Sequence, residues 1–390
     1  MTLSLDKSSW RRVALGDIAA SSKEKVDPGS GVVDRYVAGE HMDTDDLKIH
    51  RWGQVGDGYL GPAFHRRFHP GQVLYGSRRA YLRKVAVADF SGITANTTFV
   101  VEARGSGQLL QSFLPFVMKS DAFHAFAVRE SKGSVNPYLN WSDIARYDFD
   151  LPPLREQRRL AELLWSVERD RRAANRVVST VGRVVEEVTD ALLADPVFPE
   201  RRISEVLETC QYGLSVRAAE NGTYPMLRMT NLDAGYVVGR DLKYCELGGA
   251  ELAAYRVAKG DVLFNRTNSF EHVGRSGLFE LDGDFVFASY LVRLRPDPSV
   301  LDSRFLNYFI NSRLGQKRIR MHISKGVQQA NISASKLKLV NLPLPSLAEQ
   351  RKIVDRIETL SDQRDAAVKH VSAAGALYAT LSRAIFGDEK

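Results

Sequence analysis

Two short stretches decide the fold of this chain: Leu-Arg-Glu-Gln-Arg-Arg-Leu at 154–160 and Leu-Ala-Glu-Gln-Arg-Lys-Ile at 347–353. They lie 193 residues apart, and the same offset aligns Ser-Lys-Gly at 131–133 with Ser-Lys-Gly at 324–326. An offset held over some 30 residues is not expected by chance, so the chain is predicted to contain two diverged copies of a unit of about 190 residues.

Each copy is predicted to be a globular part followed by a long helix. Short β-type runs, such as 97–101, 285–287 and 291–294, alternate with turn signals and indicate an α+β domain. Pro-rich joints at 151–153 and 343–345 then end one element before the next begins. We expect two globular α+β domains at residues 1–150 and 195–346, and joints with long helices at residues 151–194 and 347–390.

Both long helices carry an apolar seam with the alternating four- and three-residue spacing of a heptad repeat. The seam is interrupted by an arginine at the same place in each copy. Two seams with the same interruption are expected to pack on each other within the chain, although two unrelated amphipathic helices remain the alternative. The predicted seam residues are Leu160, Leu164, Val167, Arg171, Val178, Val185, Ile353, Ile357, Leu360, Arg364, Val371 and Tyr378.

The net charge of +7 lies mainly in the globular parts. Residues 1–150 carry +2 and residues 195–346 carry +4, whereas 151–194 carry +1 and 347–390 are neutral. This distribution favours a polyanionic partner for the globular parts and not for the helices.

Within the globular parts, the basic residues form clusters that follow matching strand signals, Gly-Gln-Val-Leu-Tyr at 71–75 and Gly-Asp-Val-Leu-Phe at 260–264. Lysine and arginine neutralise phosphates, while arginine, asparagine and glutamine can bond base edges. The clusters are therefore predicted to bind DNA, with a merely solvated face as the alternative. The candidate DNA-binding residues are Arg66, Arg67, Arg78, Arg79, Tyr81, Arg83, Lys84, Lys132, Asn136, Arg266, Thr267, Asn268, Arg275, Arg318, Arg320, Lys325, Gln328 and Gln329.

Several classes of activity lack their motifs. No Gly-x-x-x-x-Gly-Lys-Ser/Thr phosphate loop is present, which disfavours a nucleotide motor. Asn136-Pro137-Tyr138 lacks the second proline of the amino-methyltransferase loop, and the eight histidines show no metal-ligand spacing. Two isolated cysteines, no apolar run of membrane-spanning length and no signal-peptide pattern at the start favour a cytoplasmic protein. No catalytic residue and no metal site is predicted.

The repeated Glu-Gln-Arg element after a proline joint resembles the junction between recognition domain and spacer helix in type I restriction–modification specificity subunits. The stretches at 74–85 and 260–275 are also similar to that family, and the resemblance spans nearly the whole chain. It implies two target-recognition domains that each read half of a split DNA sequence. Two long helices, packed as an antiparallel coiled coil, would hold these domains apart in a pseudo-twofold symmetric arrangement.

The resemblance further implies docking of two methyltransferase subunits, joined by motor–nuclease restriction subunits. S-adenosylmethionine, ATP and Mg are then expected only on those partners, and the chain itself is expected to be non-catalytic. A coiled-coil protein adaptor, a stand-alone DNA-binding regulator and, less well supported, a self-sufficient restriction enzyme are the alternatives.

Overall fold

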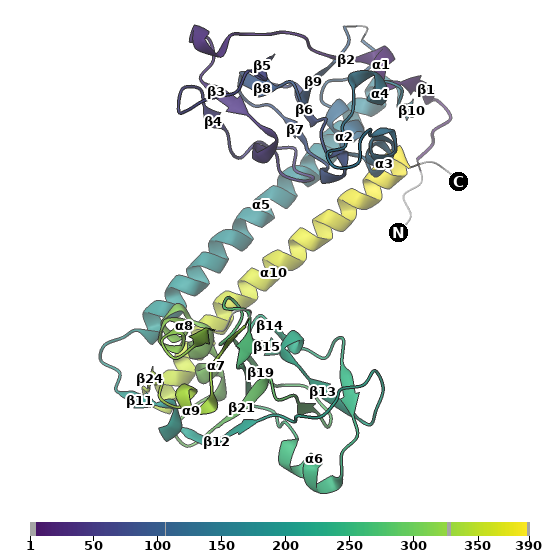
Figure 1. Ribbon diagram of the computed structural model, residues 1–390. Helices are drawn as coiled ribbons and strands as arrows, with labels where there is room; N and C mark the ends of the chain where they lie inside the picture. The colour runs from purple at the N-terminus through teal and green to yellow at the C-terminus, as the bar shows by residue number, and fades with distance from the viewer. Residues whose placement is uncertain (1–4, 106, 326–328, 388–390) are drawn as a thin grey trace. The chain divides into compact units, whose positions relative to one another are not determined.

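The computed structural model describes residues 5–105, 107–325 and 329–387 (Figure 1). Of residue 325 it describes the backbone and not the side chain. The chain divides into two compact units: Met1–Asn175 with Lys369–Lys390, and Arg176–Val368. Helices α5 (Leu154–Leu193) and α10 (Leu347–Phe386) each contribute to both units. Among the described helices, none combines the length and apolarity that crossing a bilayer requires.

The first unit contains two four-stranded sheets and a strand pair. The sheets have the orders β2-β9-β6-β7 and β4-β3-β8-β5, and β1 pairs antiparallel with β10. The strands are β1 (Arg11–Ala14), β2 (Ala19–Ser21), β3 (Arg35–Val37), β4 (Gly53–Gln54), β5 (Phe64–Phe68), β6 (Val73–Gly76), β7 (Val85–Val87), β8 (Gly92–Ala95), β9 (Thr98–Ala103) and β10 (Asp148–Leu151). The helices are α1 (Leu15–Ile18), α2 (Leu114–Lys119), α3 (Asp121–Glu130) and α4 (Trp141–Ile144), with 3-10 turns at Pro28–Ser30, Gly39–His41 and Ala80–Leu82.

The second unit is built around a six-stranded sheet of order β12-β21-β17-β19-β15-β14. Two three-stranded sheets, β16-β13-β20 and β18-β23-β22, and the pair β11-β24 complete it. The strands are β11 (Glu200–Arg202), β12 (Leu207–Tyr212), β13 (Tyr224–Leu227), β14 (Leu232–Asp233), β15 (Tyr236–Val237), β16 (Lys243–Cys245), β17 (Val262–Asn265), β18 (Thr267–Asn268), β19 (Ser276–Leu278), β20 (Val286–Phe287), β21 (Leu291–Pro296), β22 (Ser324–Lys325), β23 (Ala330–Asn331) and β24 (Asn341–Pro343). The helices are α6 (Gly249–Tyr255), α7 (Ser303–Asn311), α8 (Arg313–Arg320) and α9 (Ala334–Leu337), with 3-10 turns at Ile203–Glu205 and Met229–Asn231.

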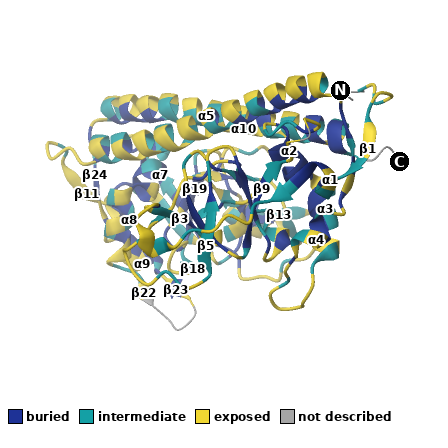
Figure 2. Ribbon diagram, turned by 90° about the horizontal axis from the view of Figure 1, so that it is seen from above, coloured by how far each residue is buried: buried dark blue, intermediate teal, exposed yellow. Residues whose placement is uncertain are grey.

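The two long helices run antiparallel inside each unit. In the first unit, Leu160 near the start of α5 shares a hydrophobic core with Ile385 near the end of α10. In the second unit, Leu193 at the end of α5 shares a core with Ile353 near the start of α10. In Figure 2, exposed residues alternate with half-buried ones along both helices. The expected α+β architecture with two long antiparallel helices is confirmed.

The predicted seam residues are the less exposed positions of these helices. All twelve are buried or half-buried, whereas positions between them, such as Arg169 and Asp362, are exposed. Leu164 is fully buried and Ile357 is 1% exposed. Because burying such a side chain stabilises a protein by about 1.5–3 kcal/mol, the seam accounts for the docking of each helix on its unit.

The glutamine of the Glu-Gln-Arg element closes the joint. Gln157 is fully buried, and its amide nitrogen donates to the carbonyls of Gln108 and Pro152, both at 2.8 Å. Its amide oxygen accepts from the backbone N–H of Leu110 at 2.8 Å. The side chain therefore ties the start of α5 to the proline joint behind it and to the segment that precedes α2.

Gln350 makes the same three bonds in the second unit. It is fully buried, donates to the carbonyls of Val300 and Pro345 at 2.8 and 2.9 Å, and accepts from the N–H of Asp302 at 2.8 Å. A buried amide whose hydrogen bonds are all satisfied favours one arrangement of the surrounding backbone. This explains why the short Glu-Gln-Arg element marks the joint in both units.

Candidate nucleic-acid interface

The basic segments that follow β6 and β17 each join a second loop through short strand pairings. In the first unit, Arg78 pairs antiparallel with Tyr138, which also pairs with Lys132. In the second, β18 pairs with β23, which pairs with β22, so that Thr267 faces Asn331 and Asn331 faces Ser324. The structure thus brings together, in both units, the two predicted loops that lie far apart in the sequence.

The first unit presents an exposed group of basic and aromatic side chains at this place. The Arg78 guanidinium lies 5.2 Å from the ring centre of Tyr138, and the backbone N–H of Arg79 donates to Pro137 at 2.7 Å. Arg79 has a φ of 51°, a left-handed conformation that is uncommon for arginine. Tyr81 is 55% exposed, and Asn136 is exposed on the adjoining loop.

The corresponding group in the second unit has half-buried side chains at residues 266–268 and exposed ones at Arg275 and Gln329. The Arg266 guanidinium lies 5.1 Å from the ring centre of Tyr212 and 3.5 Å from the carbonyl of Ser289. Thr267 and Asn268 are half-buried, and Asn268 donates to the sulfur of Met229.

Arg275 and Gln329 are exposed in the same unit. The guanidinium of Arg320 lies 5.6 Å from the ring centre of Phe270. Of the other candidates, Gln328 lies outside the described residues, and Lys325 is described only through its place in β22.

Other predicted DNA-binding residues are engaged inside their own unit. Arg83 pairs with Asp45 and Asp121, both at 2.8 Å, and Lys132 pairs with Asp143 at 2.8 Å. Arg318 binds the Asn341 carbonyl and Glu200. These groups hold loops and helices in place, and contacts of theirs with DNA stay a prediction.

Three further candidates in the first unit are engaged in the same way. Arg66 donates to the Thr98 carbonyl at 2.9 Å, and burial lowers the pKa of its guanidinium. Arg67 pairs with Glu24 at 3.1 Å, and Lys84 donates to the carbonyl of Gly39. Sequence clustering could not separate these residues from exposed ones, because their partners lie on other elements.

Two residues outside the predicted DNA-binding set complete the paired loops. Tyr138 provides the ring beneath Arg78, and Asn331 pairs with Thr267. They are separated by the same offset of 193 as the Glu-Gln-Arg elements. The repeat was the signal that could have identified them. Among the described residues, no group of three or more His, Cys, Asp or Glu side chains has an arrangement that could hold a metal.

Relatives match this architecture in sequence. A family model described as the type I restriction modification DNA specificity domain matches residues 198–371. The type I restriction enzyme EcoKI specificity subunit of Escherichia coli (strain K12) is 26% identical over 303 residues, which cover 71% of this chain and 64% of the relative. The StySPI specificity subunit of Salmonella potsdam is 28% identical over 283 residues, covering 66% and 61%. The chain is therefore similar in sequence to type I restriction enzyme specificity subunits, and the family model covers somewhat less than half of it.

A solved member of the specificity subunit family shares the fold. The type I restriction–modification S subunit from M. genitalium superposes with a TM-score of 0.63 at 15% identity, over 100% of both chains. The likeness in fold thus extends to residues 1–175 of the first unit, which the family model does not match. The chain spans less than two thirds of the length of the two sequence relatives.

Proposed function

We propose that this chain is the non-catalytic specificity subunit of a type I restriction–modification complex. In this role it reads a bipartite DNA target, one half with each unit. The observation that carries the proposal is that both units have paired loops at the end of an equivalent strand, β6 in the first and β17 in the second. In each unit this surface has exposed arginines and amides. Exposed arginine beside an aromatic ring suits both phosphate and base contacts.

The proposal includes the partners and the place of action. Two methyltransferase subunits and the motor–nuclease restriction subunits dock on the chain, and the complex acts on double-stranded DNA in the cytoplasm. S-adenosylmethionine, ATP and Mg belong to those partner subunits. The specificity subunits named among the relatives support this assignment.

Methylome sequencing tests the function in the host. Deleting the gene should remove one bipartite adenine-methylation motif, and restoring the gene should bring it back. An unchanged methylome in a host that expresses the partner subunits would contradict the proposal.

Duplex binding tests the surface itself. The double variant Arg78→Ala/Arg79→Ala should bind DNA more weakly. The slope of log K against log salt concentration should also become less steep, by about 0.9 for each phosphate that the variant no longer neutralises. Arg104→Ala is the matched control. Gly76, which leads into the paired loops, pairs with Thr98 at the start of β9, whereas the exposed Arg104 follows Ala103 at the other end of that strand. Equal losses of affinity in both variants would show a general charge effect and not a defined interface.

A further inference from the structure

One site carries buried, paired charges in the first unit and lacks them in the second. In the first unit, Lys119 at the end of α2 forms an ion pair with Glu168 of α5, and their side chains are only 4% and 1% exposed. The Lys119 ammonium also lies 4.3 Å from the ring centre of Tyr378 in α10. Arg171 completes the group, with its guanidinium 3.0 Å from Glu168. Each buried charge here has an opposite charge beside it.

The second unit has equivalent positions with different side chains. Lys119 and Asn311 each precede the serine that caps the following helix, Ser120 before α3 and Ser312 before α8. At the offset of 193, Ser361 takes the position of Glu168, Arg364 that of Arg171, and Val185 that of Tyr378. The arginine is kept while the carboxylate, ammonium and phenol are replaced by smaller neutral groups.

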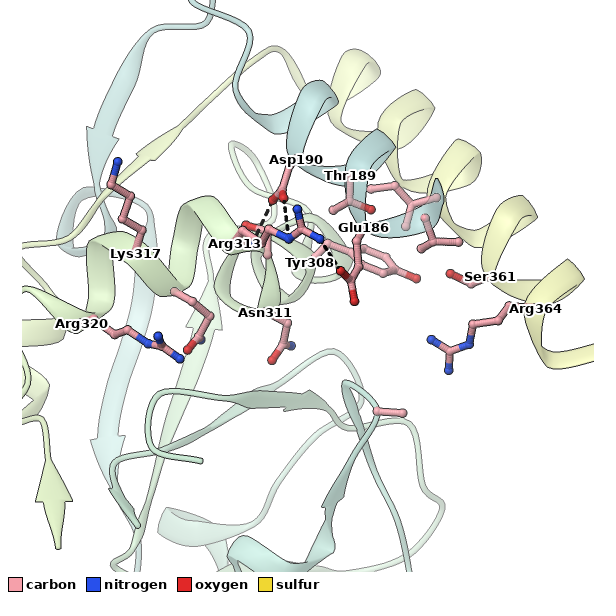
Figure 3. A pocket seen from close by; sticks show the side chains of 15 residues that line it. Glu186, Thr189, Asp190, Tyr308, Asn311, Arg313, Lys317, Arg320, Ser361 and Arg364 are labelled. Carbon is pink, nitrogen blue, oxygen red and sulfur yellow. Dashed lines mark hydrogen bonds and ion pairs between the residues drawn. The ribbon is translucent and has the colours of Figure 1, made fainter. Parts of the chain in front are cut away.

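The second unit has a cavity of about 610 Å³ at this place, lined by Val185, Asn311, Ser361 and Arg364 (Figure 3). The equivalent hollow of the first unit, beside Lys119, Arg171 and Tyr378, is smaller, at about 200 Å³. The two carboxylates of the larger cavity share one guanidinium, that of Arg313, so they leave one negative charge against the other three cations of the lining, Lys317, Arg320 and Arg364. Glu186 lies 2.6 Å from the Arg313 guanidinium, and Asp190 accepts from the Arg313 backbone N–H at 2.9 Å.

Two other arginines remain for a ligand. Arg320 from α8 and Arg364 from α10 lie on opposite sides of Asn311 in Figure 3. Arg364 pairs only with its exposed chain neighbour Asp365, at 3.5 Å, among the described residues. The site therefore carries an excess of positive charge where Glu168 supplies the negative charge in the first unit.

A second hollow of about 650 Å³ shares Tyr308, Asn311, Arg320 and Arg364 with the first and extends to Asn265. Asn265 is 4% exposed, and its amide oxygen has no hydrogen-bond partner among the described residues.

From the two copies together, we propose that the second unit binds a phosphate group at Arg364, beside Ser361, in the place that the Glu168 carboxylate takes beside Arg171 in the first unit. A guanidinium group can donate two parallel hydrogen bonds to a phosphate. The volume is within the range of small-ligand sites. A free phosphate compound and a DNA backbone phosphate share this chemistry. The site is proposed from the cavity, its charges and the comparison of the two copies, and it does not rest on the proposed function.

Inorganic phosphate, titrated into the full-length protein at constant ionic strength without DNA, tests the site by isothermal calorimetry. Saturable binding is expected. Arg364→Ala and Ser361→Glu should each weaken it at least about tenfold, the first by removing a charged donor and the second by installing the carboxylate that Glu168 provides in the first unit. Arg356→Ala, an exposed arginine of the same helix outside the cavity, should leave the affinity unchanged.

Absence of saturable binding, or equal affinity in all four proteins, overturns the proposal. Circular dichroism of each variant separates loss of the site from loss of the fold. Duplex titration then identifies the source of the phosphate. If it belongs to DNA, Arg364→Ala lowers the salt slope for duplex binding by about 0.9. An unchanged slope, with phosphate binding abolished, assigns the site to a free phosphate compound.

Discussion

At the scale of single residues, the buried glutamines of the two joints make a direct prediction about stability. Gln350→Ala removes three hydrogen bonds and leaves the Asp302 N–H and the Val300 and Pro345 carbonyls unpaired. Unpaired buried groups cost about 1–3 kcal/mol each before water compensates for them. We expect the free energy of unfolding to fall by about 2–4 kcal/mol, measured by urea denaturation.

Gln363→Ala on the same helix is the control for that measurement, since its side chain is exposed. It should change the unfolding free energy by less than about 0.5 kcal/mol. Equal effects of the two substitutions would contradict the role assigned to Gln350.

His124 predicts how the first unit responds to acid. Burial, assisted by the positive charge of Arg83, lowers the pKa of His124 to about 3, and neither ring nitrogen has a hydrogen-bond partner among the described groups. An unfolded histidine has a pKa near 6.5, so below that pH the unfolded chain binds the proton more strongly. The folded state should lose stability as the pH falls from about 6.5 toward 3, by about 2–3 kcal/mol at about pH 4.5.

His124→Leu should remove that part of the acid sensitivity, so its unfolding free energy should fall less steeply between about pH 6.5 and 4.5. Denaturation curves at several pH values measure the slope. The exposed His272→Ala should retain the slope of the parent protein. Parallel slopes for His124→Leu and the parent would refute the assignment.

The different ionic partners of Arg171 and Arg364 could not be predicted from the sequence. Both interrupt the seam at the same heptad position, but Glu168 neutralises only the first. Lys119 pairs with Glu168, and the carbonyl of Asp45 accepts from Arg171. Both residues lie far from α5 in the sequence. Periodicity predicts which face of a helix is buried and does not predict which charges meet there.

At the scale of elements, the long helices were the most predictable part. Apolar periodicity and a proline joint define α5 and α10, and Ser346 caps α10 by accepting from the Glu349 N–H at 3.3 Å. The expected strands at 97–101 and 291–294 correspond to β9 and β21. Two-residue strands such as β18 and β23 were not predictable, because they are too short for a period and exist only through pairing.

The ion pair between α2 and α5 predicts a strong coupling between these elements. Glu168→Gln leaves the Lys119 ammonium buried without its counter-charge, and burial already lowers the pKa of Lys119. Breaking such a pair costs about 3–5 kcal/mol, whereas replacing both partners by apolar residues is often close to neutral. We expect Lys119→Met/Glu168→Leu to be more stable than Glu168→Gln in denaturant titrations. The reverse order would show that the pair does not link the two helices.

The corner between α7 and α8 depends on a glycine. A Cβ at Gly315 would lie 1.8 Å from the carbonyl oxygen of Phe309, so Gly315→Ala should destabilise the protein by several kcal/mol. A Cβ at Gly182 in α5 would lie 3.8 Å from Arg364, an ordinary van der Waals distance, and Gly182→Ala should stabilise by about 0.5–1 kcal/mol. Thermal unfolding of both variants provides the comparison, and a stabilised Gly315→Ala would contradict the described corner.

At the scale of the whole molecule, two units with equivalent paired loops but different side chains suit a target with two unlike halves. Arg78 and Arg79 lie in the first unit, and Asn268 and Arg275 in the second. Truncating a side chain that bonds a base should cost about 1–3 kcal/mol of binding free energy and relax the sequence at one position. Substitutions in one unit should therefore leave the other half of the target unchanged.

Methylome sequencing of hosts that carry Arg78→Ala/Arg79→Ala or Asn268→Ala/Arg275→Ala measures this independence. The first variant should relax bases in one half of the methylated motif and the second should relax bases in the other, while the distance between the halves stays constant. Weaker methylation with an unaltered motif would assign the substituted side chains to phosphates, because backbone contacts carry no sequence information. Relaxation of both halves by one variant would contradict the division of DNA reading between the two units.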